Sequence, residues 1–192
     1  KRDDLFLPFG KYGTSGGKVR QAVSLIGNNR SYIKENHKNT IVTHTQVHST
    51  TGTILTRVAK HYNIKCIVCV GGTTPNSLKK HHMMMLAEHW GGQIRNVCGH
   101  GMHAPVMSRL HELVEQEKYF NAVFSDNVGL YPESVLDTTA NQVKNIPDKL
   151  DNMVISVGSG IQMAGILRGI VKYKKQIENI YGVCIGPDRR KK

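Results

Sequence analysis

The segment Gly158-Ser159-Gly160-Ile161-Gln162-Met163-Ala164-Gly165 lies between a short apolar run, residues 152–157, and an amphipathic stretch, residues 163–173. This order predicts a strand, a glycine-rich turn and a helix. Glycine lets the backbone approach a ligand closely, and the first N–H groups of a helix lack intrahelical partners. The residues expected to bind a phosphate group through backbone amides are Gly158, Ser159, Gly160, Ile161 and Gln162. Glycines also mark ordinary strand-to-helix turns, so that alternative stays open.

A second glycine-rich stretch, Ser15-Gly16-Gly17-Lys18, precedes residues 19–26, whose apolar residues have helical spacing. Lys18 is therefore expected at the start of a helix. A Walker phosphate loop is excluded, because Tyr12 stands where its first glycine is required and Val19 replaces the hydroxyl residue that binds magnesium. Taken alone, Lys18 could be an ordinary solvated lysine.

With the opening Lys1-Arg2-Asp3-Asp4-Leu5, these segments resemble the tryptophan-synthase-β-like, fold-type II pyridoxal-phosphate (PLP) enzymes. The opening and Gly16-Gly17-Lys18-Val19-Arg20 look most like the aminocyclopropane-carboxylate deaminase and D-cysteine desulfhydrase branch. The resemblance implies PLP as cofactor and Lys18 as the catalytic lysine that forms a Schiff base with it. It also implies that residues 158–165 are the phosphate loop.

The chain departs from that branch at three positions of these motifs. Gly17 replaces an asparagine, and Ile161 and Gln162 replace a glycine and a threonine. Backbone amides do not depend on side-chain identity, so we expect the changes to affect the reaction more than cofactor binding.

A third segment, Val47-His48-Ser49-Thr50-Thr51-Gly52, falls where the branch carries Gln-Ser-Asn-His, a loop that meets the substrate carboxylate. Hydroxyls and free amides at a helix start can hold an anion. We therefore expect Ser49, Thr50 and Thr51 to bind the substrate. Simple capping of the following helix is the alternative.

Alternating strand-like and helix-like segments predict an α/β fold with a mostly parallel sheet. The predicted strands are residues 40–44, 65–70, 93–97, 122–125, 153–157 and 180–185. The predicted crossover helices are residues 51–62, 75–90, 104–117 and 132–143. Cys66 and Cys69 would point to opposite faces of one strand, so no metal site is predicted.

The resemblance implies two Rossmann-like lobes with the cofactor between them. Residues 1–38 and 137–192 would form the larger, cofactor-binding lobe, and residues 39–136 the smaller, substrate-side lobe. Family members continue beyond Ile185, so we expect a fold shortened at the C-terminus or a sequence with omitted segments. The residue that faces the pyridine nitrogen belongs to that further part.

The formal net charge of +12 is high for an enzyme of free amino acids and suggests a polyanion partner such as DNA. Basic residues cluster in residues 79–82 and 172–192; a merely solubilising surface is the alternative. No stretch is long and apolar enough to span a bilayer, so no membrane contact is expected and a cytoplasmic location is predicted.

These features together predict a PLP-dependent lyase.

 The reaction predicted is elimination, deamination or decarboxylation of an amino acid or an amino-acid-like group, including one attached to a nucleobase in viral DNA hypermodification. A PLP-dependent β-replacement synthase is the first alternative. A catalytically inert basic module that binds nucleic acid or serves assembly is the second. Family resemblance also implies a homodimer.

Overall fold

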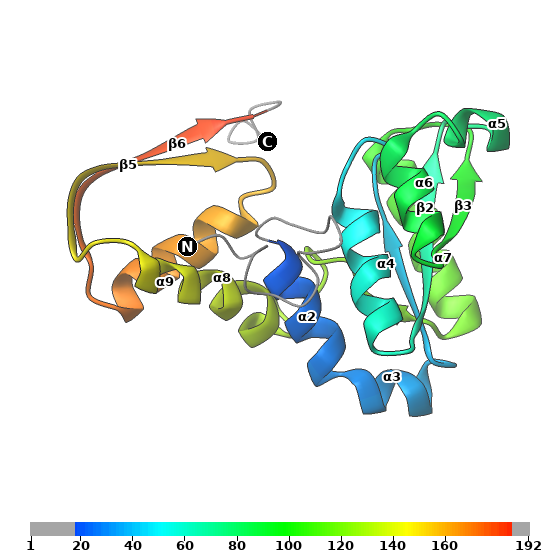
Figure 1. Cartoon of the computed structure of the whole chain (residues 1–192), viewed down its shortest axis with the longest axis horizontal. Coiled ribbons are helices and arrows are strands. Elements are labelled where there is room, and N and C mark those ends of the chain that lie inside the picture. The colour runs from blue at the N-terminus through cyan, green and yellow to red at the C-terminus, as the bar shows by residue number, and fades with distance from the viewer. Residues whose placement is uncertain (1–17, 186–192) are drawn as a thin grey trace. The chain divides into compact units, whose positions relative to one another are not determined.

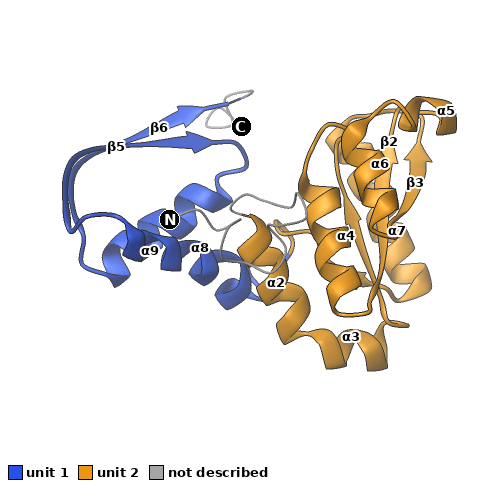
Figure 2. Cartoon of the chain, in the orientation of Figure 1, with its two compact units in different colours: residues 1, 127–192 blue, residues 2–126 orange. Residues whose placement is uncertain are grey.

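The computed structural model describes residues 18–185 (Figure 1). The predictions for residues 1–17 and 186–192, which include the Lys-Arg-Asp-Asp opening and the glycines before Lys18, lie outside the described residues. The chain divides into two compact units, Arg2–Asp126 and Asn127–Lys192, the second together with Lys1 (Figure 2). Both units are built from helices and parallel strands, which confirms the predicted α/β class.

The first unit contains a four-stranded parallel sheet. Its strands are β1 (Thr40–His44), β2 (Lys65–Gly71), β3 (Gln93–Cys98) and β4 (Phe120–Asn121), in the order β3-β2-β1-β4. The two central strands are rich in β-branched residues and nearly continuous in apolar character, as expected for strands covered on both faces. Their register pairs Thr40 with Lys65 and His44 with Cys69, so both strands end at the same edge.

Helices cover both faces of this sheet. They are α2 (Lys18–Asn28), α3 (Arg30–Asn36), α4 (Thr51–His61), α5 (Pro75–Leu78), α6 (His82–His89) and α7 (His103–Glu117). On one face, α7 buries Val106 and Leu110 in a cluster with Val42, Ile67 and Cys69. On the other face lies α4, against which α2 and α6 pack.

Cys66 and Cys69 lie on opposite faces of β2, as the alternation predicts. The Cys66 thiol lies 3.5 Å from the Thr56 hydroxyl on α4, whereas Cys69 belongs to the cluster beneath α7. Both cysteines are buried and free.

The second unit contains a two-stranded parallel sheet and the helix that connects its strands. The elements are η2 (Glu133–Asp137), α8 (Thr138–Ala140), η3 (Asn141–Asn145), β5 (Lys149–Val157), α9 (Ile161–Lys172) and β6 (Gln176–Cys184). Two glycines let α9 approach α8 and η3 closely. A Cβ on Gly165 would lie 2.6 Å from Thr139 Cβ, and one on Gly169 would lie 2.5 Å from the Ala140 carbonyl oxygen.

Three predicted elements differ from the structure. The strand predicted at residues 122–125 is wrong, because the extended segment is β4 and the Val123 N–H bonds instead to the Asn121 side chain. The helix predicted at residues 75–90 is interrupted at His81, whose backbone is extended. Residues 133–145 change from π to α to 3-10 geometry. In this region the Thr138 and Thr139 hydroxyls bond to carbonyl oxygens four residues earlier, a pattern that disturbs regular helices.

Within residues 18–185, no helix has both the length and the apolar character needed to cross a membrane. The predicted lobes, residues 1–38 with 137–192 and residues 39–136, stay a prediction. By contacts alone, α2 and α3 belong to the compact unit that contains β1–β4.

Candidate active site

Lys18 is the first residue of α2, and its ammonium is held by a residue distant in sequence. Its Nζ donates a hydrogen bond to Thr51 Oγ1 at 2.8 Å. Part of the lysine remains exposed, but burial around the ammonium lowers the pKa of Lys18 below its ordinary value. A lowered lysine pKa increases the fraction of neutral amine, which is the form that attacks a carbonyl group.

The predicted substrate loop meets this lysine. Ser49 Oγ donates to Thr51 Oγ1 at 3.1 Å, so Thr51 accepts hydrogen bonds from both Ser49 and Lys18. Ser49 Oγ also accepts a hydrogen bond from the Thr51 N–H at 3.3 Å. This local bond is of the kind expected if the loop only caps the following helix. Thr50 is exposed and its side chain makes no capping bond to α4. The structure therefore joins Lys18, Ser49 and Thr51, while Thr50 lies beside them in sequence only.

Two contacts attach the start of α7 to the segment after β1. His44 Nε2 and His103 Nδ1 are 2.9 Å apart, and Gln46 Nε2 donates to the Gly101 carbonyl oxygen at 2.9 Å. His44 ends β1, so these contacts lie at the carboxyl edge of the parallel sheet, where ligands of α/β proteins bind. The sequence showed both histidines near predicted strand ends, but spacing alone could not pair two residues 59 positions apart.

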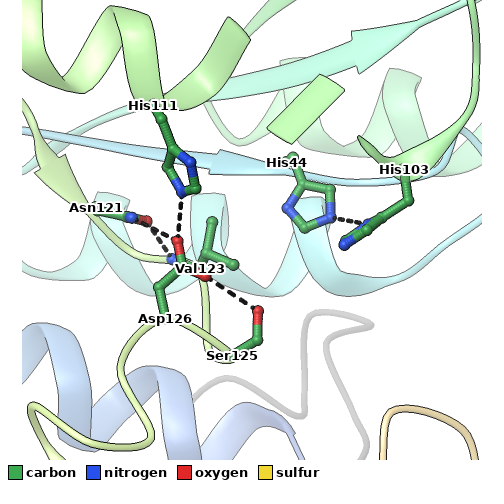
Figure 3. A network of polar contacts seen from close by, with 7 residues as sticks. All are labelled: His44, His103, His111, Asn121, Val123, Ser125 and Asp126. Atoms are coloured by element: carbon green, nitrogen blue, oxygen red, sulfur yellow. Dashed lines mark hydrogen bonds and ion pairs between the residues drawn. The ribbon is translucent and has the colours of Figure 1, made fainter. Parts of the chain in front are cut away.

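An acidic group lies on the other side of His44 (Figure 3). Asp126 accepts hydrogen bonds from His111 at 2.8 Å and from Asn121 at 2.7 Å through one carboxylate oxygen, and from Ser125 at 3.3 Å through the other. Partial burial would raise the pKa of Asp126, but these hydrogen bonds outweigh it and the pKa is lowered. Asp126 therefore carries a negative charge at neutral pH. Sequence analysis missed this residue, whose position after a strand was its only signal.

The predicted phosphate loop precedes α9 in the second unit. Gly160 caps α9 with a left-handed backbone, φ 86°, a conformation that favours glycine. Within the described residues, no heavy atom lies within 4 Å of a Cβ built on Gly158 or Gly160, so the backbone there is open. The first free amides of this 12-residue helix follow directly, at Ile161 and Gln162. Free backbone amides at a helix start can bind a phosphate group, so phosphate binding by this loop stays a prediction.

The two units therefore present features of one class of protein: an α/β protein with a lysine of lowered pKa and a glycine-rich loop suited to phosphate. Residues 4–187 match the model of the family "Pyridoxal-phosphate dependent enzyme", so the chain belongs to that family. Family membership confirms the fold-type II class that the sequence motifs indicated.

The chain is also similar to a curated protein and to several solved structures. The chain is 29% identical over 203 residues to the "O-seryl-dTMP PLP-dependent decarboxylase" of Salmonella phage ViI, with 98% of the chain and 47% of the relative covered. It thus spans about half the length of the curated relative.

The solved structures show the same fold at lower identity. O-ureido-L-serine synthase matches with a TM-score of 0.69 and 22% identity, over 94% of the chain and 54% of the synthase. Threonine deaminase isoform 2 of Solanum lycopersicum matches with a TM-score of 0.66 and 15% identity, over 90% of the chain and 43% of the deaminase.

Proposed function

We propose that this chain is a PLP-dependent lyase that removes the carboxylate from an amino-acid-like group attached to a nucleotide. The observation that carries the proposal is the Lys18–Thr51 hydrogen bond. It places a lysine of lowered pKa against the predicted substrate loop in a member of the PLP enzyme family. Decarboxylation is favoured over elimination and deamination because the phage relative is named a decarboxylase.

The residues have the following roles in this proposal. Lys18 binds the cofactor covalently through its amine, and Thr51 orients that amine. Backbone amides of residues 158–162 bind the cofactor phosphate. Ser49, Thr50 and Thr51 bind the substrate carboxylate. When bound, PLP accepts the electron pair released as a bond at the α-carbon breaks.

The basic charge supports a nucleotide substrate. A net charge of +12 attracts phosphate-bearing molecules over long range. The binding of a free amino acid does not require such long-range attraction. We further propose that the site derives from the aminocyclopropane-carboxylate deaminase and D-cysteine desulfhydrase branch, as the Gly-Gly-Lys segment suggests. DNA as a partner, a homodimer and a cytoplasmic location belong to the same proposal.

The test is a product assay of the full 192-residue chain with PLP. O-seryl-dTMP and free serine are supplied separately, and Lys18→Arg serves as the variant that keeps the charge. We expect O-seryl-dTMP to lose the mass of CO2 with the wild-type chain and to stay intact with Lys18→Arg. Loss of the whole seryl group would indicate elimination. Exchange of its β-substituent for an added nucleophile would indicate the β-replacement synthase.

Two results would contradict the proposal. Equal turnover of free serine would contradict the nucleotide substrate. No product with either substrate, combined with DNA binding that survives Lys18→Arg and removal of PLP, would favour the inert binding module.

A further inference from the structure

The His44–His103 pair lies beside the predicted substrate loop and has no role in the function proposed above. His44, at the end of β1, contacts His103 at the start of α7, and Gln46, in the segment just after β1, donates a hydrogen bond to the Gly101 carbonyl oxygen. The same segment continues to Ser49 and Thr51, which contact Lys18 within the same compact unit. The charge of Lys18 is close enough to His44 to affect its pKa.

His44 stays neutral at physiological pH. Burial, and after it the charges of His103, Lys18 and His111, lower the pKa of His44 to about 4, although the charge of Asp126 acts in the opposite direction. His103, by contrast, is exposed.

The hydrogen bond between the rings fixes where the protons lie. A neutral histidine has one donor and one acceptor nitrogen. His44 Nδ1 is buried, without a hydrogen-bond partner among the described residues, and Figure 3 places it on the side of Asp126. The negative charge of Asp126 favours a proton on Nδ1, so His44 Nε2 accepts a hydrogen bond that His103 Nδ1–H donates. His103 Nε2 is then the free nitrogen of an exposed ring.

We propose that His103 is the general acid of the reaction and that His44 is a positioning residue that fixes its orientation and tautomer. This inference rests on the proposed function. As the bond from the α-carbon to the carboxylate breaks, CO2 leaves, and the protonated His103 Nε2 gives its proton to the same carbon. Neutral His103 then takes one proton from water, so each turnover consumes one proton, as decarboxylation requires.

The kinetic test compares three variants in the PLP-loaded chain. His103→Ala removes the ring, and His103→Asn keeps a group near Nδ1 for the bond to His44 but has no Nε2. His100→Ala, at an exposed histidine of the same loop, is the matched control. We expect His103→Ala and His103→Asn to lower kcat by roughly 100-fold or more with KM unchanged. Added imidazole should restore His103→Ala but not His103→Asn. Wild-type kcat in His103→Asn would overturn the proposal.

A second measurement does not depend on turnover. Nitrogen-15 NMR of histidine-labelled protein reports which ring nitrogen carries the proton. The proposal requires neutral His103 to carry its proton on Nδ1, and His44→Phe to return it to the Nε2-protonated form that free histidine favours. A wild-type His103 protonated on Nε2 would overturn the proposal. If the wild-type chain releases no CO2, the proposed function fails, and the NMR result then decides only whether His44 fixes the tautomer of His103.

Discussion

The side chain of Lys18 donates a hydrogen bond to Thr51, a residue 33 positions away in sequence. The sequence identified both residues, but through separate motifs: a Gly-Gly-Lys segment and a hydroxyl-rich loop. Motif spacing carries no information on a contact made through the folding of α2 against α4. For the same reason the His44–His103 pair was found only in the structure.

Thr51 is expected to control the reactivity of Lys18. Thr51→Val removes the acceptor while keeping the side-chain shape, whereas Thr51→Ser retains the hydroxyl. A net hydrogen bond is worth about 1 kcal/mol, so Thr51→Val should weaken covalent PLP binding roughly fivefold. Absorbance titration with PLP measures this effect. Equal binding by the Val and Ser variants would show that the hydrogen bond does not orient the lysine.

The two buried thiols of β2 are expected to lower the folding stability of the protein at high pH. Burial raises the pKa of both Cys66 and Cys69 from 9.0 to about 12. Between these values the unfolded chain releases thiol protons that the folded chain keeps. Folding stability therefore falls as pH rises from 9 towards 12, by up to about 1.4 kcal/mol per pH unit for each thiol.

Urea unfolding between pH 8 and pH 11 measures this loss of stability. The double variant Cys66→Ala, Cys69→Ala is the control, because lysines and tyrosines also titrate in this range. The wild-type chain should lose more stability than the double variant. An equal loss of folding stability with pH in the two proteins would contradict the raised pKa values of Cys66 and Cys69.

At the scale of elements, runs of apolar and β-branched residues predicted the two central strands closely, since β1 spans the predicted residues 40–44 and β2 exceeds the predicted residues 65–70 by one residue. It failed at residues 122–125, where the side chain of Asn121 captures the Val123 N–H and ends the strand. It also failed at residues 133–145, because hydroxyl-to-carbonyl bonds depend on local rotamers that apolar spacing does not report. The glycine-rich turn between β5 and α9 was predicted because its glycines follow an apolar run and precede an amphipathic stretch, whereas phosphate binding by this turn stays a prediction.

Gly169 is expected to be required for packing in the second unit. A Cβ at Gly169 would lie 2.5 Å from the Ala140 carbonyl oxygen, and backbone cannot move aside as a side chain can. Gly169→Ala should therefore destabilise the protein by about 1–3 kcal/mol, as overpacked cores do. Thermal unfolding followed by circular dichroism tests this. Gly158→Ala is the control, since a Cβ there meets no described atom within 4 Å; an equal Tm for both variants would contradict the packing role.

At the scale of the whole molecule, composition predicted the charge but not its distribution. Lys175 belongs to the basic C-terminal cluster in the sequence, yet its side chain is 8% exposed and pairs with Asp148 at 2.6 Å. The basic residues of the cluster are therefore not equally available to a polyanion. Lys79 and Lys80, between α5 and α6, are exposed and offer a clearer test.

Binding to single-stranded DNA is expected to depend steeply on salt. For six phosphate contacts on a single strand, affinity should fall by roughly 300-fold between 50 and 200 mM salt. Substituting Lys79 and Lys80 together with glutamine should reduce the magnitude of the log–log slope by about 1.4. Fluorescence anisotropy measures both, with Lys175→Gln as the paired-lysine control. Binding that does not change with salt would contradict a phosphate-contacting role.

The central claim is that Lys18 binds PLP covalently, and the visible absorbance spectrum of the PLP-loaded chain tests it most directly. The wild-type chain should develop a band that borohydride reduction removes, and the reduced cofactor should be found by mass spectrometry on Lys18. Lys18→Ala should show neither the band nor the modified peptide. A wild-type chain without the band, or a band that persists in Lys18→Ala, would contradict the claim.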